Sequence, residues 1–98
     1  MKHFVIELIY KAPIEKIQKV RPKHRDFIQK LCDEGIMLLA GTQVPGIGGV
    51  LIARADSMEE IAEILSNDPY QQENLAHYQY IEFNPVIKQD FLSNWINN

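Results

Sequence analysis

The chain has 98 residues, enough for one domain with a single core, and its 46% hydrophobic and 23% charged residues are typical of a globular protein. The formal net charge of −3, with lysines and arginines scattered among acidic residues, argues against nucleic acid as a partner. No apolar run reaches the roughly 20 residues of a membrane span, and the N-terminus leads into a strand pattern rather than a signal peptide. Because a single cysteine, Cys32, also fits a reducing compartment, we expect a cytoplasmic protein without a membrane partner.

The first half of the chain predicts three strands and one main helix. Residues 2–10 alternate between two faces and predict the first strand. Proline is tolerated in the first turn of a helix but not inside one, so we expect 14–20 to be a short helical or irregular piece and the main helix to begin at Pro22. This helix should end near Gly35, and residues 36–41 and 49–55 should form the second and third strands.

The second half predicts another helix, a fourth strand and an amphipathic tail. Ser57 and Glu60 form a capping box that starts a helix, which Asn67-Asp68-Pro69 stops. A short helix should follow from Pro69 to Leu75, then a strand over 77–83. After Pro85, apolar residues recur at helical spacing. We therefore expect a single domain, residues 1–98, with a core over 1–85 and a C-terminal extension over 86–98.

The order β-α-β-β-α-β predicts an α+β, ferredoxin-like fold. Right-handed crossovers place the first and third strands at the centre of a four-stranded antiparallel sheet, with both helices on one face. The other face, with Val5, Ile9 and either the tyrosines of the fourth strand or their neighbours, is too apolar for open water. A second copy related by a twofold axis is the simplest cover, so we expect a homodimer or a higher oligomer built from it.

His24 is the polar residue that the main helix directs inward. On a helical wheel it falls within the apolar stripe of Phe27, Ile28 and Leu31, while its charged neighbours lie off that stripe. A histidine placed in this way is either a catalytic group or a satisfied, partly buried core residue.

Asp68 follows the second helix, which packs beside the main helix on the same sheet face, so its carboxylate is within reach of His24. An imidazole oriented by a carboxylate is a usable general base or acid near neutral pH. The alternative is that Asp68 is an ordinary N-cap of the helix beginning at Pro69.

Several short motifs resemble the YCII-related family in order and spacing over about residues 1–85. They are Arg21-x-x-His24, Gly35, Ala40-Gly41, Gly48-Gly49, Ser57-x-Glu59-Glu60 and Asp68-Pro69-Tyr70. The resemblance implies a dimeric α/β barrel and a pocket in which His24 and Asp68 are catalytic. It also implies that Arg21, Tyr70 and Gly49 contact the substrate.

The same resemblance implies elimination or isomerisation of a small organic molecule without a cofactor. One branch of the family is similar to a dehydrochlorinase acting on a chlorinated hydroxyquinol, and the wider superfamily includes muconolactone isomerases. Thr42, where proline is common, and the bulky polar residues 71–74 depart from the pattern, so the substrate class stays open. A non-catalytic ligand-binding or assembly module is the alternative. A third hypothesis is that the tail, residues 86–96, docks the dimer onto itself or onto another protein.

No metal site is predicted. His3 and Glu7 lie roughly 13 Å apart along one strand, too far for shared ligation, and His77 has no ligand nearby in the sequence. The glycines at 46–49 enter a strand rather than a helix and predict a hairpin loop or pocket lid instead of a phosphate site. For Arg54 we expect a salt bridge, the alternative being an anionic ligand, and for Cys32 a core position.

Overall fold

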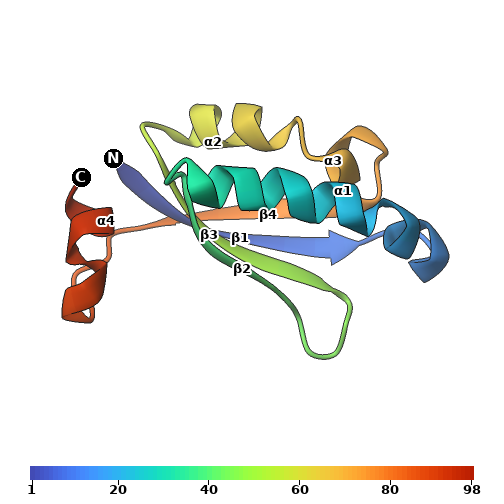
Figure 1. Ribbon diagram of the computed structural model, residues 1–98, viewed down its shortest axis with the longest axis horizontal. Coiled ribbons are helices and arrows are strands. Elements are labelled where there is room, and N and C mark those ends of the chain that lie inside the picture. Colours follow the sequence, from blue (N-terminus) through green and yellow to red (C-terminus); the bar gives the residue numbers. More distant parts are fainter.

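The computed structural model describes all 98 residues and contains one four-stranded sheet with the helices of residues 14–72 on one side (Figure 1). Its elements are β1 (Lys2–Tyr10), α1 (Ile14–Asp33), β2 (Met37–Thr42), β3 (Gly48–Ala55), α2 (Met58–Leu65), α3 (Pro69–Gln72), β4 (Ala76–Phe83), the 3₁₀ turn η1 (Asp90–Leu92) and α4 (Ser93–Asn97). The sheet is antiparallel in the order β2-β3-β1-β4. The ferredoxin-like prediction is confirmed, with β1 and β3 central. None of the helices combines the length and the apolar character that crossing a membrane requires.

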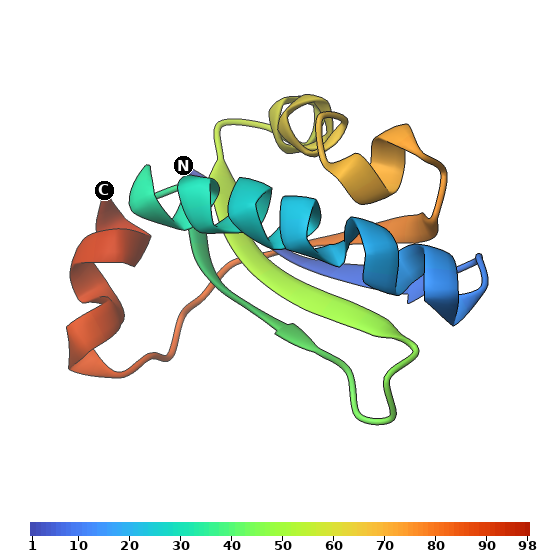
Figure 2. The same ribbon diagram turned by 45° about the vertical axis from the view of Figure 1, so that its right-hand side comes forward.

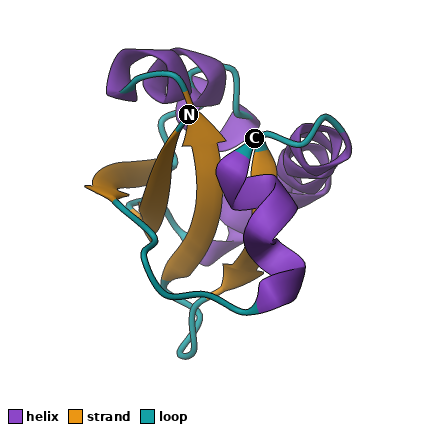
Figure 3. Cartoon of the chain, turned by 90° about the vertical axis from the view of Figure 1, so that its left-hand side faces the viewer, coloured by secondary structure: helices purple, strands orange, loops and turns teal.

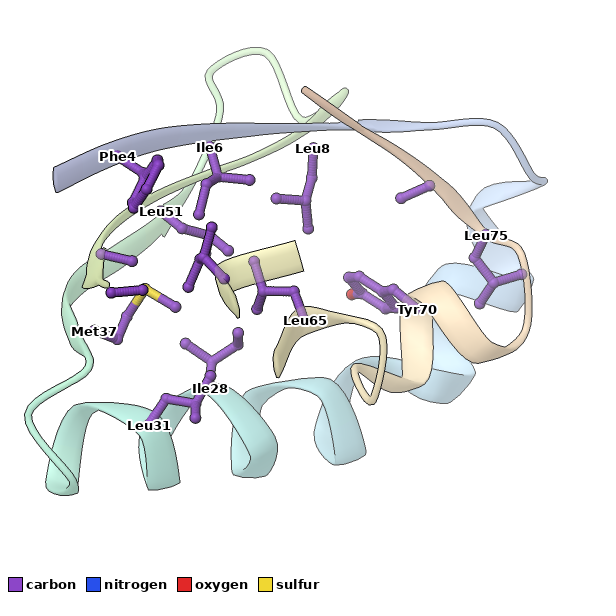
Figure 4. Packing of buried hydrophobic residues seen from close by; sticks show 14 of the residues in the cluster. Phe4, Ile6, Leu8, Ile28, Leu31, Met37, Leu51, Leu65, Tyr70 and Leu75 are labelled. Carbon is purple, nitrogen blue, oxygen red and sulfur yellow. The ribbon is translucent and has the colours of Figure 1, made fainter. Parts of the chain in front are cut away.

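The core lies between the sheet and its layer of helices. Alternate residues of β1, namely Phe4, Ile6 and Leu8, face the helices and are buried (Figure 4). Ile28 and Leu31 of α1 approach them from the opposite side. Full burial of one such side chain contributes about 1.5–3 kcal/mol, so this two-layer packing fixes how α1 sits over the sheet.

The main helix begins earlier than predicted. Instead of starting at Pro22, α1 runs without interruption from Ile14, with Pro22 in its interior. Ile17 and Val20, which precede the proline, are buried in the same core as the residues that follow it. Pro22 and Gln18, the residue whose carbonyl loses its i+4 donor, are both exposed. Packing on both sides of the proline therefore outweighs the cost of about 3 kcal/mol, and His24 lies mid-helix rather than in the first turn.

Two predicted helix boundaries are confirmed. Gly35 has φ +80°, a left-handed conformation that favours glycine, and it follows the end of α1. At the start of α2, the Ser57 hydroxyl accepts a hydrogen bond from the Glu60 amide. The Glu60 carboxylate accepts from the amide of Asp56 rather than that of Ser57, so the capping box is shifted by one residue on that side.

The face of the sheet away from the helices carries an apolar row across all four strands. Strand pairing aligns Leu39 with Ile52, Ile52 with Val5, and Val5 with Ile81. Leu39 and Ile81 remain 54% and 50% exposed. The sequence left open whether the tyrosines of β4 or the residues next to them lie on this face. The residues next to them, Ile81 and Phe83, do so. We name it the outer face.

The C-terminal tail packs on its own chain at one end of the outer face (Figure 3). The Trp95 indole donates a hydrogen bond to the Gly35 carbonyl at 2.9 Å, and the Trp95 ring lies 5.5 Å from the ring of His3. Ile87 and Phe91 of the same segment are 93% and 81% exposed. Trp95 is therefore the anchor of the tail.

The prediction for Arg54 is wrong. Instead of pairing with a carboxylate, its guanidinium donates to two carbonyl groups, those of Gly35 at 2.8 Å and Trp95 at 2.6 Å. The guanidinium carbon also lies 5.2 Å from the centre of the Trp95 ring, within cation–π range. Arg54 thus joins the end of α1 to the tail.

Candidate active site

His24 projects from the middle of α1 toward α3 and meets the carboxylate of Asp68. Its Nδ1 lies 2.7 Å from Oδ1 and 2.9 Å from Oδ2 of Asp68. The His24 side chain is 13% exposed, whereas Asp68 is completely buried. A carboxylate accepts hydrogen bonds, so this geometry assigns the donor proton to Nδ1, and in the neutral imidazole the lone pair is then on Nε2.

Asp68 is held in place by two further donors. The backbone amide of Tyr70 donates to Oδ1 at 3.0 Å, which is the N-cap bond of α3, and the Tyr78 hydroxyl donates to Oδ2 at 2.5 Å. Burial, followed by the charge of Asp68, raises the pKa of Tyr78, so its hydroxyl keeps its proton. The two sequence-based roles of Asp68 therefore coexist, because one carboxylate caps α3 and also binds the histidine.

Tyr70 lies flat against His24. The two rings are 9° from parallel with their centres 3.9 Å apart. The Tyr70 hydroxyl accepts a hydrogen bond from Nε of Arg21 at 3.4 Å, and Nη2 of Arg21 donates to the Tyr10 hydroxyl at 3.5 Å. Burial raises the pKa of Tyr70, so the phenol stays neutral beside the guanidinium.

A cavity of about 360 Å³ lies next to this cluster. Most of its lining comes from α1 and from the β2–β3 hairpin, whose backbones are drawn in Figure 2. Its walls are formed by Leu8, Tyr10, Arg21, His24, Arg25, Ile28, Gln29, Cys32, Ala40, Gly41, Thr42, Gly49, Leu51 and Tyr70. This volume is at the small end of the range for ligand sites in proteins. No protein group forms a hydrogen bond with Nε2 of His24, so that nitrogen is free for a ligand.

The match to known proteins covers the part of the chain that builds this site. Residues 1–84 match the model of the YCII-related domain. The chain belongs to the YCII-related family. A search of curated proteins found no significant match.

Among solved structures, the YCII-related chain is similar to 5-chloro-2-hydroxyhydroquinone dehydrochlorinase (TftG) from Burkholderia phenoliruptrix AC1100, in complex with 2,5-dihydroxybenzoquinone. The TM-score is 0.62 and the sequence identity is 19%, over 83% of this chain and 90% of that chain. At this identity the similarity shows a shared fold.

In this YCII-related protein, four of the five site residues predicted from the sequence line the cavity. His24, Arg21, Tyr70 and Gly49 line it, whereas Asp68 lies buried behind His24. Gly49 contributes backbone only, and an added Cβ there would lie 3.0 Å from the Gly41 carbonyl oxygen. The floor of the cavity at β3 is therefore shaped by the absence of a side chain.

Sequence reasoning missed Tyr78 and the cavity residues Tyr10 and Arg25. The period-two pattern of β4 places Tyr78 and Tyr80 on one face, and that face proves to be the one toward the helices. The alternation of β4 is therefore the sequence signal that directs Tyr78 toward the helix layer. Cys32 also lines the cavity, and burial raises the pKa of its thiol, which therefore stays protonated.

The described chain contains no group of three or more histidine, cysteine, aspartate or glutamate side chains placed to hold a metal ion. The chemistry that the cavity residues themselves support is proton transfer at Nε2 of His24.

Proposed function

We propose that this protein is a small enzyme in which His24 transfers a proton to or from a small organic molecule bound in the cavity. One observation carries the proposal: Asp68 holds Nδ1 through both carboxylate oxygens while Nε2 has no protein partner. A general base of this kind contributes about 10²–10⁴-fold to a reaction rate.

In the proposed reaction, the unprotonated Nε2 takes a proton from a C–H or O–H group of the ligand. The buried Asp68 carboxylate stabilises the resulting imidazolium through Nδ1. In an elimination, the electron pair left on the ligand forms a double bond and the leaving group departs as an anion. In an isomerisation, the imidazolium returns the proton to a different carbon, so that no atom is gained or lost.

The shared fold with a dehydrochlorinase supports elimination as the first reaction class to test. Loss of hydrogen chloride needs a base for the proton, and chloride leaves without help from an acid. In the cavity, His24 is the candidate base. Burial raises the pKa of the Tyr70 phenol and of the Cys32 thiol, so both are weaker acids than usual, and the elimination does not need an acid.

A non-catalytic ligand-binding module is the second candidate. The observation that favours it is the small number of groups suited to proton transfer, because the lining residues include one imidazole, that of His24, and no carboxylate. Such a protein needs the cavity and its charges but not the free lone pair on Nε2.

We also propose that the protein works as a homodimer paired through the outer face. The apolar row from Leu39 to Ile81 crosses all four strands and is half exposed at both ends in the single chain. A second copy of the same face covers it with matching side chains, as a twofold interface requires.

The function is tested by chloride release from 5-chloro-2-hydroxyhydroquinone and by turnover of a panel of small cyclic acids and lactones. We expect His24→Gln to lower kcat on any substrate found by about 10²–10⁴-fold. Lys23→Gln is the control, because Lys23 is exposed on the same helix and does not line the cavity. It should leave the rate unchanged.

A cavity-filling variant shows whether a ligand uses the cavity, and His24→Gln then separates the two candidates. Ala40 pairs with the buried Leu51 and so faces the helices, and it lines the cavity. Ala40→Phe should abolish both binding and turnover. If molecules that compete for the cavity bind equally to the native protein and to His24→Gln and none is ever converted, the enzyme proposal is wrong and the binding module replaces it.

A further inference from the structure

The cavity has a charge opposite to that of the chain as a whole. The formal net charge of the protein is −3, yet the cavity is lined by Arg21 and Arg25 and by no carboxylate. Asp68, the nearest acid described in the site, is completely buried behind His24 and engaged by it. A concave site lined by charges of one sign concentrates its field on whatever enters.

Arg21 is oriented without being neutralised. Two of its five N–H donors are directed at tyrosine hydroxyls, those of Tyr70 and Tyr10, which are neutral acceptors. The hydrogen bond to Tyr70 is the largest of the contributions that raise the pKa of Arg21, so the guanidinium is charged under all ordinary conditions. Three N–H donors, including both on Nη1, remain without a protein partner.

Neither cavity arginine has a counterion in the chain. The salt bridges of the protein are Lys2 with Glu82 and His24 with Asp68, and no carboxylate lies within 4.0 Å of Arg21 or Arg25. A half-buried guanidinium that is fixed by neutral groups and left unpaired is the arrangement that recognises an external anion.

From these observations we propose that the cavity binds a small planar carboxylate, with Arg21 as the residue that pairs with it. Planar carboxylate oxygens match the fork of the guanidinium, and Arg25 at the exposed rim adds a second positive charge. This substrate class rests on the site of the proposed function, because the bound acid then lies in the same cavity as Nε2 of His24. The cavity volume of about 360 Å³ limits the acid to one ring or a short chain.

The test compares benzoate with its neutral isostere benzamide, which share size and planarity. Each is titrated into the native protein while the backbone amides of Thr42 and Gly49, which line the cavity, are followed by NMR. We expect saturable shifts with benzoate and an affinity for benzamide that is at least about tenfold weaker, because only the carboxylate pairs with the charge. Benzoate binding should also weaken as salt is added.

Arg21→Gln should remove the preference for benzoate, bringing its affinity down to that of benzamide. Lys23→Gln is the matched control, because it removes one positive charge from the exposed side of the same helix and lines a different part of the surface. It should leave both affinities unchanged. The native comparison stands on its own if Arg21→Gln fails to fold.

Three results would overturn the proposal: equal affinity for benzoate and benzamide, no saturable binding of either, or the same preference in Arg21→Gln as in Lys23→Gln. Failure of the enzyme proposal is distinguishable from these results. If His24→Gln keeps the benzoate preference and no acid is ever converted by the native protein, the carboxylate site stands and the protein is a binding module.

Discussion

The rings of His24 and Tyr70 lie parallel, with their centres 3.9 Å apart. Asp68 already fixes the direction of Nδ1 within the plane of the imidazole, and Tyr70 fixes the plane itself. The two contacts leave the imidazole one orientation, so Nε2 has a defined direction before any ligand arrives. Defined placement of a catalytic group is itself a large part of catalysis.

The two roles of Tyr70 can be separated by substitution. Tyr70→Phe keeps the stacked ring but removes the hydroxyl that accepts from Arg21, so we expect weaker carboxylate binding with little change in kcat. Tyr70→Leu removes the ring as well and should lower kcat in addition. Steady-state kinetics on both variants checks this, and equal losses of kcat in the two would show that the stack does not position His24.

Tyr78 and Tyr80 form a matched pair for testing the support of Asp68. The Tyr78 hydroxyl donates to the buried carboxylate, so Tyr78→Phe should lower the free energy of unfolding by about 1.5–3 kcal/mol, the range for a hydrogen bond to a charged group. The buried Tyr80 hydroxyl has no partner, so Tyr80→Phe should change stability by no more than about 0.5 kcal/mol or raise it. Urea unfolding of the two variants measures the difference, and equal losses would contradict this assignment.

The proposed dimer depends on the centre of the apolar row. Val5→Asp places a charge on both copies at the same twofold interface, so the solution mass should fall from two chains to one. Lys23→Asp, a charge change on the exposed side of α1, should leave the mass unchanged. Light scattering after gel filtration gives the masses, and a native protein that is monomeric at all concentrations would remove the dimer.

The stability of the fold should depend on pH through His3. Burial, followed by the positive charge of the N-terminus, lowers the pKa of His3 from 6.5, although the hydrogen bond with the Ile96 backbone acts in the opposite direction. The folded pKa is therefore below the unfolded one, so the folded state keeps the full contribution of His3 above pH 6.5 and loses it as pH falls through the lowered value. Trp95, the only tryptophan, reports the change by fluorescence. His3→Phe should lack this acid transition, and an identical pH midpoint in that variant would exclude His3 as its cause.

Local patterns were sufficient to predict the fold and the inward position of His24, because strand alternation and the apolar stripe of a helix are encoded in neighbouring residues. They were insufficient at Pro22, where burial of Ile17 and Val20 overrides the local preference against an internal proline. The balance there is set by tertiary packing, which lies outside any local window.

In the candidate site too, some features could be predicted from local sequence and others depend on tertiary packing. Asp68 could be predicted as an N-cap from Pro69 alone, but its contact with His24 depends on how α1 and α3 pack. Arg54 was misassigned because its partners are backbone carbonyl groups of Gly35 and Trp95, 19 and 41 residues away. Carbonyl groups occur at every residue, so no pattern of side chains marks them in advance.

The most direct test of the account is the tautomer of His24, read from the ¹⁵N NMR shifts of its ring nitrogens at a pH where the ring is neutral. We expect the proton on Nδ1 in the native protein, where the Asp68 carboxylate accepts the hydrogen bond, and a shift of population toward the Nε2–H form in Asp68→Asn. A native protein with its proton on Nε2 would have no lone pair facing the cavity, and the proposed role of His24 as a base would be wrong.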